Sequence, residues 1–215
     1  MYISGFFKET DVNVAIGFMQ SHPFAALVAV DKNIPIASHL VLNVQTKEDV
    51  LYAEGHMARS NPLWKLFKNE AGESKSGTGD VLLMFSGPNA YISARWYDHV
   101  NVPTWNYIAV HAYGSASVIT ARSEINSMMQ TLVSAHETGD EYSFEGLPGG
   151  FRDQQMEGIV AFKIVINRLE SSYKLSQNRN DVDYKNIIFE LEKQSDPRSH
   201  EIASEMRKKR NIIPK

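Results

Sequence analysis

The sequence predicts an α+β fold in which an antiparallel sheet closes into a barrel, and three observations support this prediction. Seven or so strand-like runs are interrupted by helical runs, without the regular strand–helix alternation of a doubly wound parallel sheet. No glycine-rich GxGxxG or GxxxxGKS pattern follows a strand, which argues against a Rossmann dinucleotide site and a P-loop. The chain has 215 residues, 43% of them hydrophobic, which is enough to bury a core and a ligand.

The composition narrows the classes of protein to consider. A net charge of −3 and a pI near 6.2 argue against a broad basic surface that would bind DNA through many phosphates. The absence of cysteine excludes disulfides, iron–sulfur clusters and thiolate zinc sites. The N-terminus MYISGFFKETDV has no signal pattern, and no apolar run approaches the ~18 residues that span a bilayer. We therefore expect a cytoplasmic protein that does not contact a membrane.

The first part of the chain predicts a helix, a hairpin and a further strand. Residues 10–21 carry a capping Thr or Asp, followed by apolar residues at helical spacing. Two apolar runs in residues 23–44 flank the turn Asp31-Lys32-Asn33, which is typical of a β-hairpin. A third strand is expected near residues 50–56.

A helix start is predicted after the third strand. Asn is favourable at the N-cap and Pro at the first helical position, as in Asn61-Pro62. Residues 68–80, KNEAGESKSGTGD, are rich in Gly, Ser and charge and predict a loop, to which we assign no chemistry. Further strands are predicted at residues 80–86, 90–94 and 105–120, with turns at 87–89 and 101–103.

The last third of the chain changes from sheet to helix. An amphipathic helix is predicted at residues 121–137, then a loop at 139–150 and a last strand at 159–169. Two helical patterns follow, DVDYKNIIFELEKQ and PRSHEIASEMRKKR. We therefore expect a main domain at residues 1–178 and a C-terminal helical appendage at residues 179–215 that packs on it.

The segment HMARSNP, residues 56–62, is the strongest candidate for binding a charged ligand, because it joins a strand end to a helix start. Free backbone N–H groups and the positive end of the helix dipole are expected there, beside the cation of Arg59 and the hydroxyl of Ser60. This combination suits a phosphate dianion. The alternative is that Asn61 only caps the helix and that Arg59 pairs with a surface acid.

Three histidines, His39, His56 and His111, fall within predicted strands or at their ends. Three imidazoles could form an open zinc site, but their spacing matches no metal signature. We favour hydrogen-bonding roles for them and expect no metal. No GxSxG elbow supports a Ser–His–Asp triad, and we assign no catalytic residue.

Two further groups have both a structural and a functional interpretation. Aromatic side chains could stack on a ring system or fill the barrel, and core filling is favoured for each of Trp64, Trp96, Trp105, Tyr91, Tyr97 and Tyr107. Four adjacent cations at residues 207–210 end a predicted helix, where they complement its dipole. A solvated terminus is favoured over a DNA contact.

Motifs in a fixed order cover nearly the whole chain: MYI, HPFAALV, ASHLVL, GHMARSNPLW, SGPNAYISARWY, VPTWNYIAVHAYG and KLSQNR. Together they resemble the FMN-binding negative transcriptional regulators of the PaiB type, known from the control of protease production and sporulation. The pieces VPTWNY with AVHAYG, and GHMARSNP, are specific. Arg95 departs from the usual ISPSWY pattern and adds a charge near the expected subunit seam.

The resemblance implies a split barrel related to pyridoxamine-phosphate oxidases and flavin reductases, usually a homodimer with FMN at the subunit interface. By motif, the flavin ring would be lined by Ser38, His39 and Leu40. The ribityl chain and phosphate would be held by His56, Met57, Ala58, Arg59, Ser60 and Asn61. The site or the dimer seam would be closed by Thr104, Trp105 and Asn106, and approached from the C-terminal side by Lys174, Ser176, Gln177 and Asn178.

For function, the resemblance implies an FMN-binding repressor of transcription that responds to flavin or redox state. Its partner would be DNA or a transcription factor, and a protein partner fits a chain with no evident helix-turn-helix and one small basic run. The alternative is an FMN-dependent oxidoreductase that uses NAD(P)H and an unknown acceptor, since split barrels also host redox enzymes. A third hypothesis, in which flavin is lost or replaced by a ligand such as haem, carries the least weight.

Overall fold

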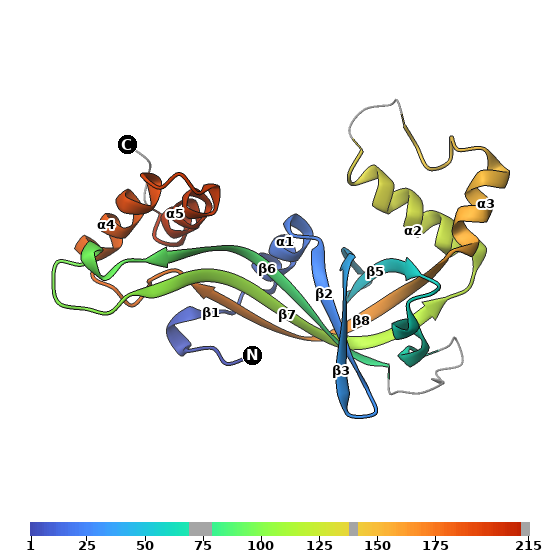
Figure 1. Cartoon of the computed structure of the whole chain (residues 1–215), viewed down its shortest axis with the longest axis horizontal. Coiled ribbons are helices and arrows are strands. Elements are labelled where there is room, and N and C mark those ends of the chain that lie inside the picture. The colour runs from blue at the N-terminus through green and yellow to red at the C-terminus, as the bar shows by residue number, and fades with distance from the viewer. Residues whose placement is uncertain (69–78, 138–141, 212–215) are drawn as a thin grey trace. The chain divides into compact units, whose positions relative to one another are not determined.

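A computed structural model describes residues 1–68, 79–137 and 142–211 of the chain (Figure 1). The described residues form eight strands, five α-helices and three 3₁₀ helices. Strand pairs with an assigned register are antiparallel, so the predicted α+β class with an antiparallel sheet is confirmed. None of the helices within these described ranges is long and apolar enough to cross a bilayer.

The chain divides into two compact units. Unit 1 comprises Met1–Ala15, Ser86–Val110 and Glu170–Lys215, and unit 2 comprises Ile16–Phe85 and His111–Leu169. Four elements contribute residues to both units: α1 (Val12–Ser21), β6 (Asp80–Ile92), β7 (Thr104–Ile119) and β8 (Ile159–Lys174). The residues that carry a binding prediction therefore fall into two sets, one in each unit.

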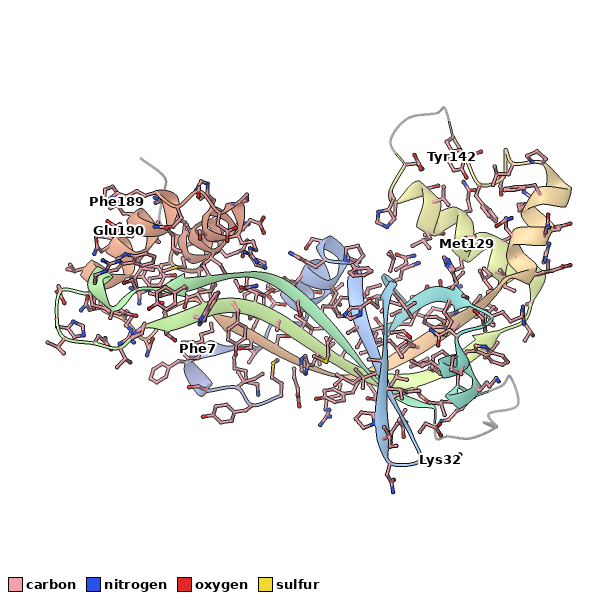
Figure 2. All side chains as sticks on the ribbon, in the orientation of Figure 1. Phe7, Lys32, Met129, Tyr142, Phe189 and Glu190 are labelled. Atoms are coloured by element: carbon pink, nitrogen blue, oxygen red, sulfur yellow. The ribbon has the colours of Figure 1, made fainter. Side chains whose placement is uncertain are left out.

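In unit 2, the strands pair in the order β3-β2-β6-β7-β8-β5-β4. The hairpin of β2 (Phe24–Asp31) and β3 (Ile34–Val41) is confirmed, and Lys32 and Asn33 at its tip have φ values of 47° and 65° (Figure 2). A second tight turn joins β4 (Asn43–Lys47) to β5 (Val50–Ala58). Both turns need left-handed backbone at two successive residues, which Asn and Asp tolerate better than most side chains.

Helices cover part of the unit 2 sheet. The predicted amphipathic helix is α2 (Arg122–Ser134), whose Met128 packs with Ile119 of β7 and Ala161 of β8 in one buried cluster. A further helix, α3 (Gly149–Glu157), was not predicted, because its GGFRDQQME sequence has little apolar periodicity. The predicted loops fall partly on residues 69–78 and 138–141, which lie outside the described residues.

Unit 1 contains the C-terminal helices. The two predicted helices are α4 (Asp181–Glu192), capped by Asn180, and α5 (Pro197–Lys209), capped by Asp196. Their buried faces meet, and the Tyr184 hydroxyl donates to the Met206 carbonyl at 2.7 Å. Short elements complete the unit: η1 (Gly5–Phe7), η3 (Ala94–Trp96) and β1 (Lys8–Glu9), which pairs with β8. The domain boundary predicted after residue 178 stays a prediction.

One predicted turn is absent, and one predicted helix is shorter than expected. The turn predicted at residues 87–89 is wrong, because β6 continues through Gly87-Pro88-Asn89. The β2–β6 ladder is registered only at residues 82–84, so the missing N–H of Pro88 removes no bond from it. The helix predicted after Asn61 is a five-residue 3₁₀ helix, η2 (Pro62–Leu66).

Candidate functional site

Two predicted site segments meet in unit 2, where β3 carries residues 38–40 and β5 leads into residues 59–61. The side-chain amide of Asn61 donates a hydrogen bond to Ser38 Oγ at 2.8 Å. Asn61 Oδ1 accepts a hydrogen bond from the Leu63 backbone N–H at 3.0 Å, so the predicted N-cap is confirmed. One side chain thus caps the turn and ties the two segments together.

The turn after Asn61 supplies less positive potential than a full helix would. A five-residue 3₁₀ helix aligns few peptide dipoles, and one of its free N–H groups is already bonded to the Asn61 side chain. The positive charge available at this point therefore comes from the Arg59 side chain rather than from a helix dipole.

Arg59 is bonded to backbone carbonyls and not to an acid. Its Nε donates to the Glu157 carbonyl at 2.6 Å, and its Nη2 donates to the Ile159 carbonyl at 2.7 Å. No carboxylate within the described residues pairs with it, which rules out the surface acid of the alternative interpretation there. A guanidinium has five N–H donors, and carbonyl acceptors leave its charge intact. The exposed Arg59 can therefore still bind an anion.

His56 on β5 offers a free ring nitrogen. Its Nδ1 is buried and, among the residues described, has no hydrogen-bond partner. Burial lowers the pKa of His56, so the imidazole is neutral at pH 7 and can accept or donate one hydrogen bond. An orphaned polar atom of this kind suits contact with a heterocyclic ligand.

The remaining predicted residues of unit 2 differ in exposure. Met57 is buried in the core, whereas Ala58 and Ser60 are exposed. His39 is also exposed and stacks on Phe24, with ring centroids 5.7 Å apart. Leu40 is half-buried on β3. The exposed Ser60 hydroxyl and the half-buried strand face are compatible with a ligand, while Met57 supports the strand from within.

Unit 1 brings together Thr104, Trp105 and Lys174. The Lys174 ammonium donates to Thr104 Oγ1 and to the Trp105 carbonyl, the latter at 2.7 Å. Burial, and then the nearby Arg179 charge, lower the pKa of Lys174. No carboxylate in the described part of the chain neutralises it. Lys174 is therefore a second cation with room for an anionic partner.

Asn106 and Ser176 are buried against each other in unit 1. Asn106 Nδ2 donates to Ser176 Oγ at 3.0 Å, and Ser176 Oγ donates to Asn106 Oδ1 at 3.1 Å. The next residue, Gln177, uses its side chain on its own turn, accepting from the Leu175 N–H at 2.8 Å. Asn178 is exposed. Apart from Asn178, these side chains hold the turn after β8 in place.

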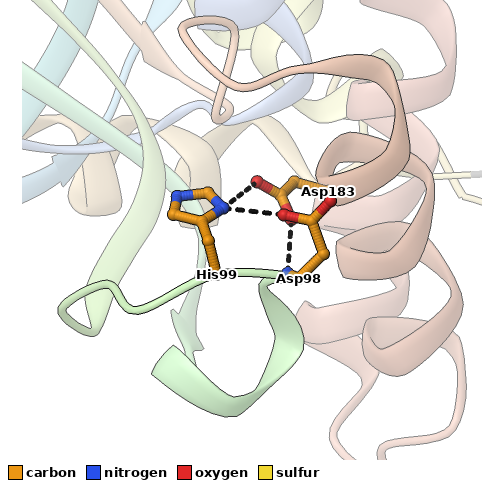
Figure 3. A group of neighbouring side chains, drawn as sticks. All are labelled: Asp98, His99 and Asp183. Atoms are coloured by element: carbon orange, nitrogen blue, oxygen red, sulfur yellow. Dashed lines mark hydrogen bonds and ion pairs between the residues drawn. The ribbon is translucent and has the colours of Figure 1, made fainter.

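A cluster that sequence reasoning missed joins the loop before β7 to α4 (Figure 3). His99 Nδ1 lies 2.7 Å from Asp98 Oδ1 and 3.4 Å from Asp183 Oδ2, and the Asp98 N–H donates to Asp183 Oδ1 at 2.9 Å. Among residues 1–68, 79–137 and 142–211, these three side chains form the one group of His and acidic residues whose ligand atoms lie close enough together to share an ion. Its atoms already bond one another, so it fastens the loop to the helix. Local spacing gives no signal for it.

The C-terminal basic run is paired with acids. The cations of residues 207–210 lie between 2.6 and 2.8 Å from carboxylates, in order those of Glu192, Glu205, Glu9 and Asp181. Arg210 also donates to the carbonyls of Gln177 and Arg179. Lys208 and Lys209 are exposed, and Arg207 and Arg210 are half-buried, so the run lies at the surface, as the sequence favours, with a carboxylate beside each cation.

Known proteins resemble this chain over most of its length. The family model described as "Putative FMN-binding domain" matches residues 1–168. The chain is similar to "Protease synthase and sporulation protein PAI 2" of Bacillus subtilis, with 39% identity over 211 residues, 97% of this chain and 98% of that protein.

Two solved structures resemble the fold. The flavocytochrome Anf3 from Azotobacter vinelandii has a TM-score of 0.63 and 14% identity, covering 86% of this chain and 78% of that one. An FAD and heme binding protein from Mycobacterium smegmatis has a TM-score of 0.53 and 11% identity, covering 78% and 73% respectively. At such identities the likeness concerns the fold alone, and the predicted split-barrel class is confirmed.

Proposed function

Because the chain belongs to the PaiB-type family, whose domain is described as "Putative FMN-binding domain", we propose that it binds FMN and acts as a negative regulator of transcription. One observation supports FMN binding in particular. The Arg59 cation has no acidic partner among the described residues, and it lies two positions before Asn61, which bonds Ser38. A phosphate dianion is the kind of group that such a guanidinium binds in a bidentate way.

Different residues of unit 2 would bind different parts of the cofactor. Arg59 and the Ser60 hydroxyl would hold the phosphate, and His56 Nδ1 would bond a polar atom of the ribityl chain or ring. Bound FMN supplies redox chemistry through its ring, and the chain supplies orientation and hydrogen bonds. The role of Lys174 in unit 1, which its motif implies, stays a prediction.

We also propose a homodimer that holds FMN at its interface. Support comes from Phe24 and Val30, apolar side chains on one face of the β2–β3 hairpin that are 62% and 57% exposed, and from Ile34 at its tip, which is 64% exposed on the other face. Several apolar side chains on one hairpin usually mark a surface that another chain covers. Light scattering of the flavin-loaded protein would give the mass of a monomer or a dimer.

For the regulatory function, we propose that the protein acts through a protein partner and not through extensive contacts with DNA. The net charge is −3, and the cations of residues 207–210 are paired with carboxylates. DNA binding depends on many unpaired cations that release counterions from the phosphates. The name of the Bacillus subtilis relative suggests control of protease production or sporulation as the process to examine.

Spectra of the purified protein test the cofactor. Absorbance bands near about 370 and 450 nm would report flavin, whereas a Soret band would report haem. A colourless protein that leaves the fluorescence of added FMN unchanged would contradict the flavin proposal. This result would leave the family membership intact and would direct attention to another ligand.

Two further measurements separate regulator from enzyme. We expect promoter DNA or a transcription factor to bind in a way that changes with the flavin redox state. We also expect the flavin to stay oxidised under excess NAD(P)H. Steady NAD(P)H turnover with an acceptor, and no binding of either partner, would instead identify an FMN-dependent oxidoreductase.

A further inference from the structure

Unit 1 contains a cavity of about 490 Å³, and Trp105 is the one residue of its lining that the FMN prediction also uses. Its walls come from β6, η3, the start of β7 and the junction of α4 with α5, where Figure 2 labels Glu190 on α4. Cavities of this size hold drug-sized ligands in other proteins. The kind of ligand follows from the charges, rings and hydroxyls on the walls.

One charge on the cavity wall is unpaired. Arg198 is bound by Asp196 through Nη2–Oδ2 at 2.9 Å, and Glu190 is bound by Lys193 at 2.7 Å. The Arg95 side chain has no hydrogen-bond or ion-pair partner in the part of the chain that the structure describes. With the other charges balanced, the cavity carries about one positive charge and favours an anion.

Two aromatic rings line the same cavity as this cation. Tyr91 of β6 and Trp105 of β7 meet edge to face, with ring centroids 6.0 Å apart and an interplanar angle of 67°. About half of each side chain is exposed, 49% for Tyr91 and 53% for Trp105. An edge-to-face pair leaves a ring face free, and a flat ligand could stack on it.

A hydroxyl adds a further polar group to the wall of the cavity. Ser199 on the first turn of α5 is only 7% exposed, and its hydroxyl makes no hydrogen bond to any described residue. This hydroxyl is therefore available to donate a hydrogen bond to a ligand atom in the cavity.

We propose that this cavity binds a planar aromatic acid, with its ring on Tyr91 and Trp105 and its carboxylate or phosphate on Arg95 and the Ser199 hydroxyl. Arginine binds either acid group through two parallel N–H donors. The site is additional to the FMN site proposed at residues 56–61, and it does not depend on that proposal. Such a ligand would act as an effector of the protein.

Calorimetric titration tests the proposal with three matched probes: 2-naphthoate, 2-naphthyl phosphate and the neutral 2-naphthamide. Each is added to FMN-saturated and to FMN-free protein, so that a failure of the flavin proposal does not affect the result. We expect at least one acid to bind with 1:1 stoichiometry, and the amide to bind more weakly. The tighter acid identifies the acid group, and either preference supports the proposal.

Variants of the cavity wall locate the binding. Arg95→Gln should weaken binding of the acid about tenfold or more and leave the amide unaffected, because it removes a charge-assisted hydrogen bond. Trp105→Leu should weaken both acid and amide. Lys185→Gln, on an exposed position of α4 outside the cavity, removes the same charge and should change nothing.

Three results would overturn the proposal. One is the absence of heat with both acids at about 1 mM, a concentration that detects even weak sites. Another is acid binding that Arg95→Gln does not weaken. The third is release of bound FMN by 2-naphthoate, seen as a return of flavin fluorescence, which would make the cavity part of the flavin site.

Discussion

The Asn61 side-chain amide lies 2.8 Å from Ser38 Oγ, so one hydrogen bond joins the β3 edge strand to the turn after β5. The same side chain caps that turn through the Leu63 N–H. We expect Asn61→Ala to lower the free energy of unfolding by about 2 kcal/mol, because it removes both a cap and a hydrogen bond. Ser38→Ala removes only the hydrogen bond and should cost about 1 kcal/mol. Urea unfolding followed by tryptophan fluorescence measures both, and equal losses would mean that the cap contributes nothing.

Replacing Arg59 separates phosphate binding from support of the fold. We expect Arg59→Gln to weaken FMN binding about tenfold or more, and to leave the affinity for riboflavin, which lacks the phosphate, nearly unchanged. Quenching of flavin fluorescence measures both affinities. An equal loss for the two flavins would show instead that Arg59 acts through its bonds to the Glu157 and Ile159 carbonyls.

The ammonium of Lys174 predicts a pH dependence of stability. Burial, and then Arg179, lower its pKa below the ordinary value of 10.5. Between the lowered pKa and 10.5, the unfolded chain binds more protons than the folded one, so this group makes stability rise with pH. Lys174→Met should remove that rise. The unfolding free energy of the wild type minus that of the variant should therefore increase from pH 8 toward pH 10.5. A difference that stays constant over this range would contradict the prediction.

Lys163 binds two carboxylates of very different exposure, at 2.9 Å from Glu54 and 3.0 Å from Glu124. The Glu54 residue is only 8% exposed. Lys163→Met leaves the Glu54 carboxylate unpaired and should cost about 2–3 kcal/mol. Glu124→Gln removes the exposed partner and should cost less than about 0.5 kcal/mol. Thermal unfolding of the two variants at pH 7 compares them, and similar losses would show that burial of Glu54 is unimportant.

Gly114 in the AVHAYG motif has no room for a side chain. A Cβ there would clash with the Val165 carbonyl oxygen and lie 2.9 Å from Ile164 Cγ2. We expect Gly114→Ala to cost about 3 kcal/mol, because β7 and β8 would have to move apart. Gly17→Ala is the matched control, since a Cβ on this helical residue meets nothing within 4 Å. It should raise stability by up to about 1 kcal/mol, and a neutral Gly114→Ala would contradict the close packing of these strands.

Local signals predicted the elements that local chemistry determines. The hairpin follows from Asp31-Lys32-Asn33 between two apolar runs, and α4 and α5 follow from the helical patterns of their sequences. The same local logic was wrong at residues 87–89, where Gly-Pro-Asn reads as a turn. The β2 ladder ends before this segment, and β7 is the other strand that neighbours β6. The sequence of the segment alone carries no information about such pairing.

In the candidate site, too, contacts between residues close in sequence could be predicted and contacts between distant residues could not. The Asn61 cap was predictable, because its partner is two residues away. The hydrogen bonds from Arg59 to carbonyls about a hundred residues further along the chain could not be predicted. The contact between Asp183 and His99 could not be predicted either. Contacts of this length depend on the finished fold, so residue type shows only that a cation or a carboxylate is available for them.

The long strands that contribute to both units restrict how relatives of this protein can vary in length. Side chains alternate between the two faces of a strand, so one inserted residue inside the 16-residue β7 would exchange the faces of every residue that follows. Its buried positions, among them Ile108, Val110 and Ala112, would then move to the half-buried face of the strand. Insertions and deletions among homologous sequences should therefore gather in connections such as residues 97–103 and leave β7 unchanged in length.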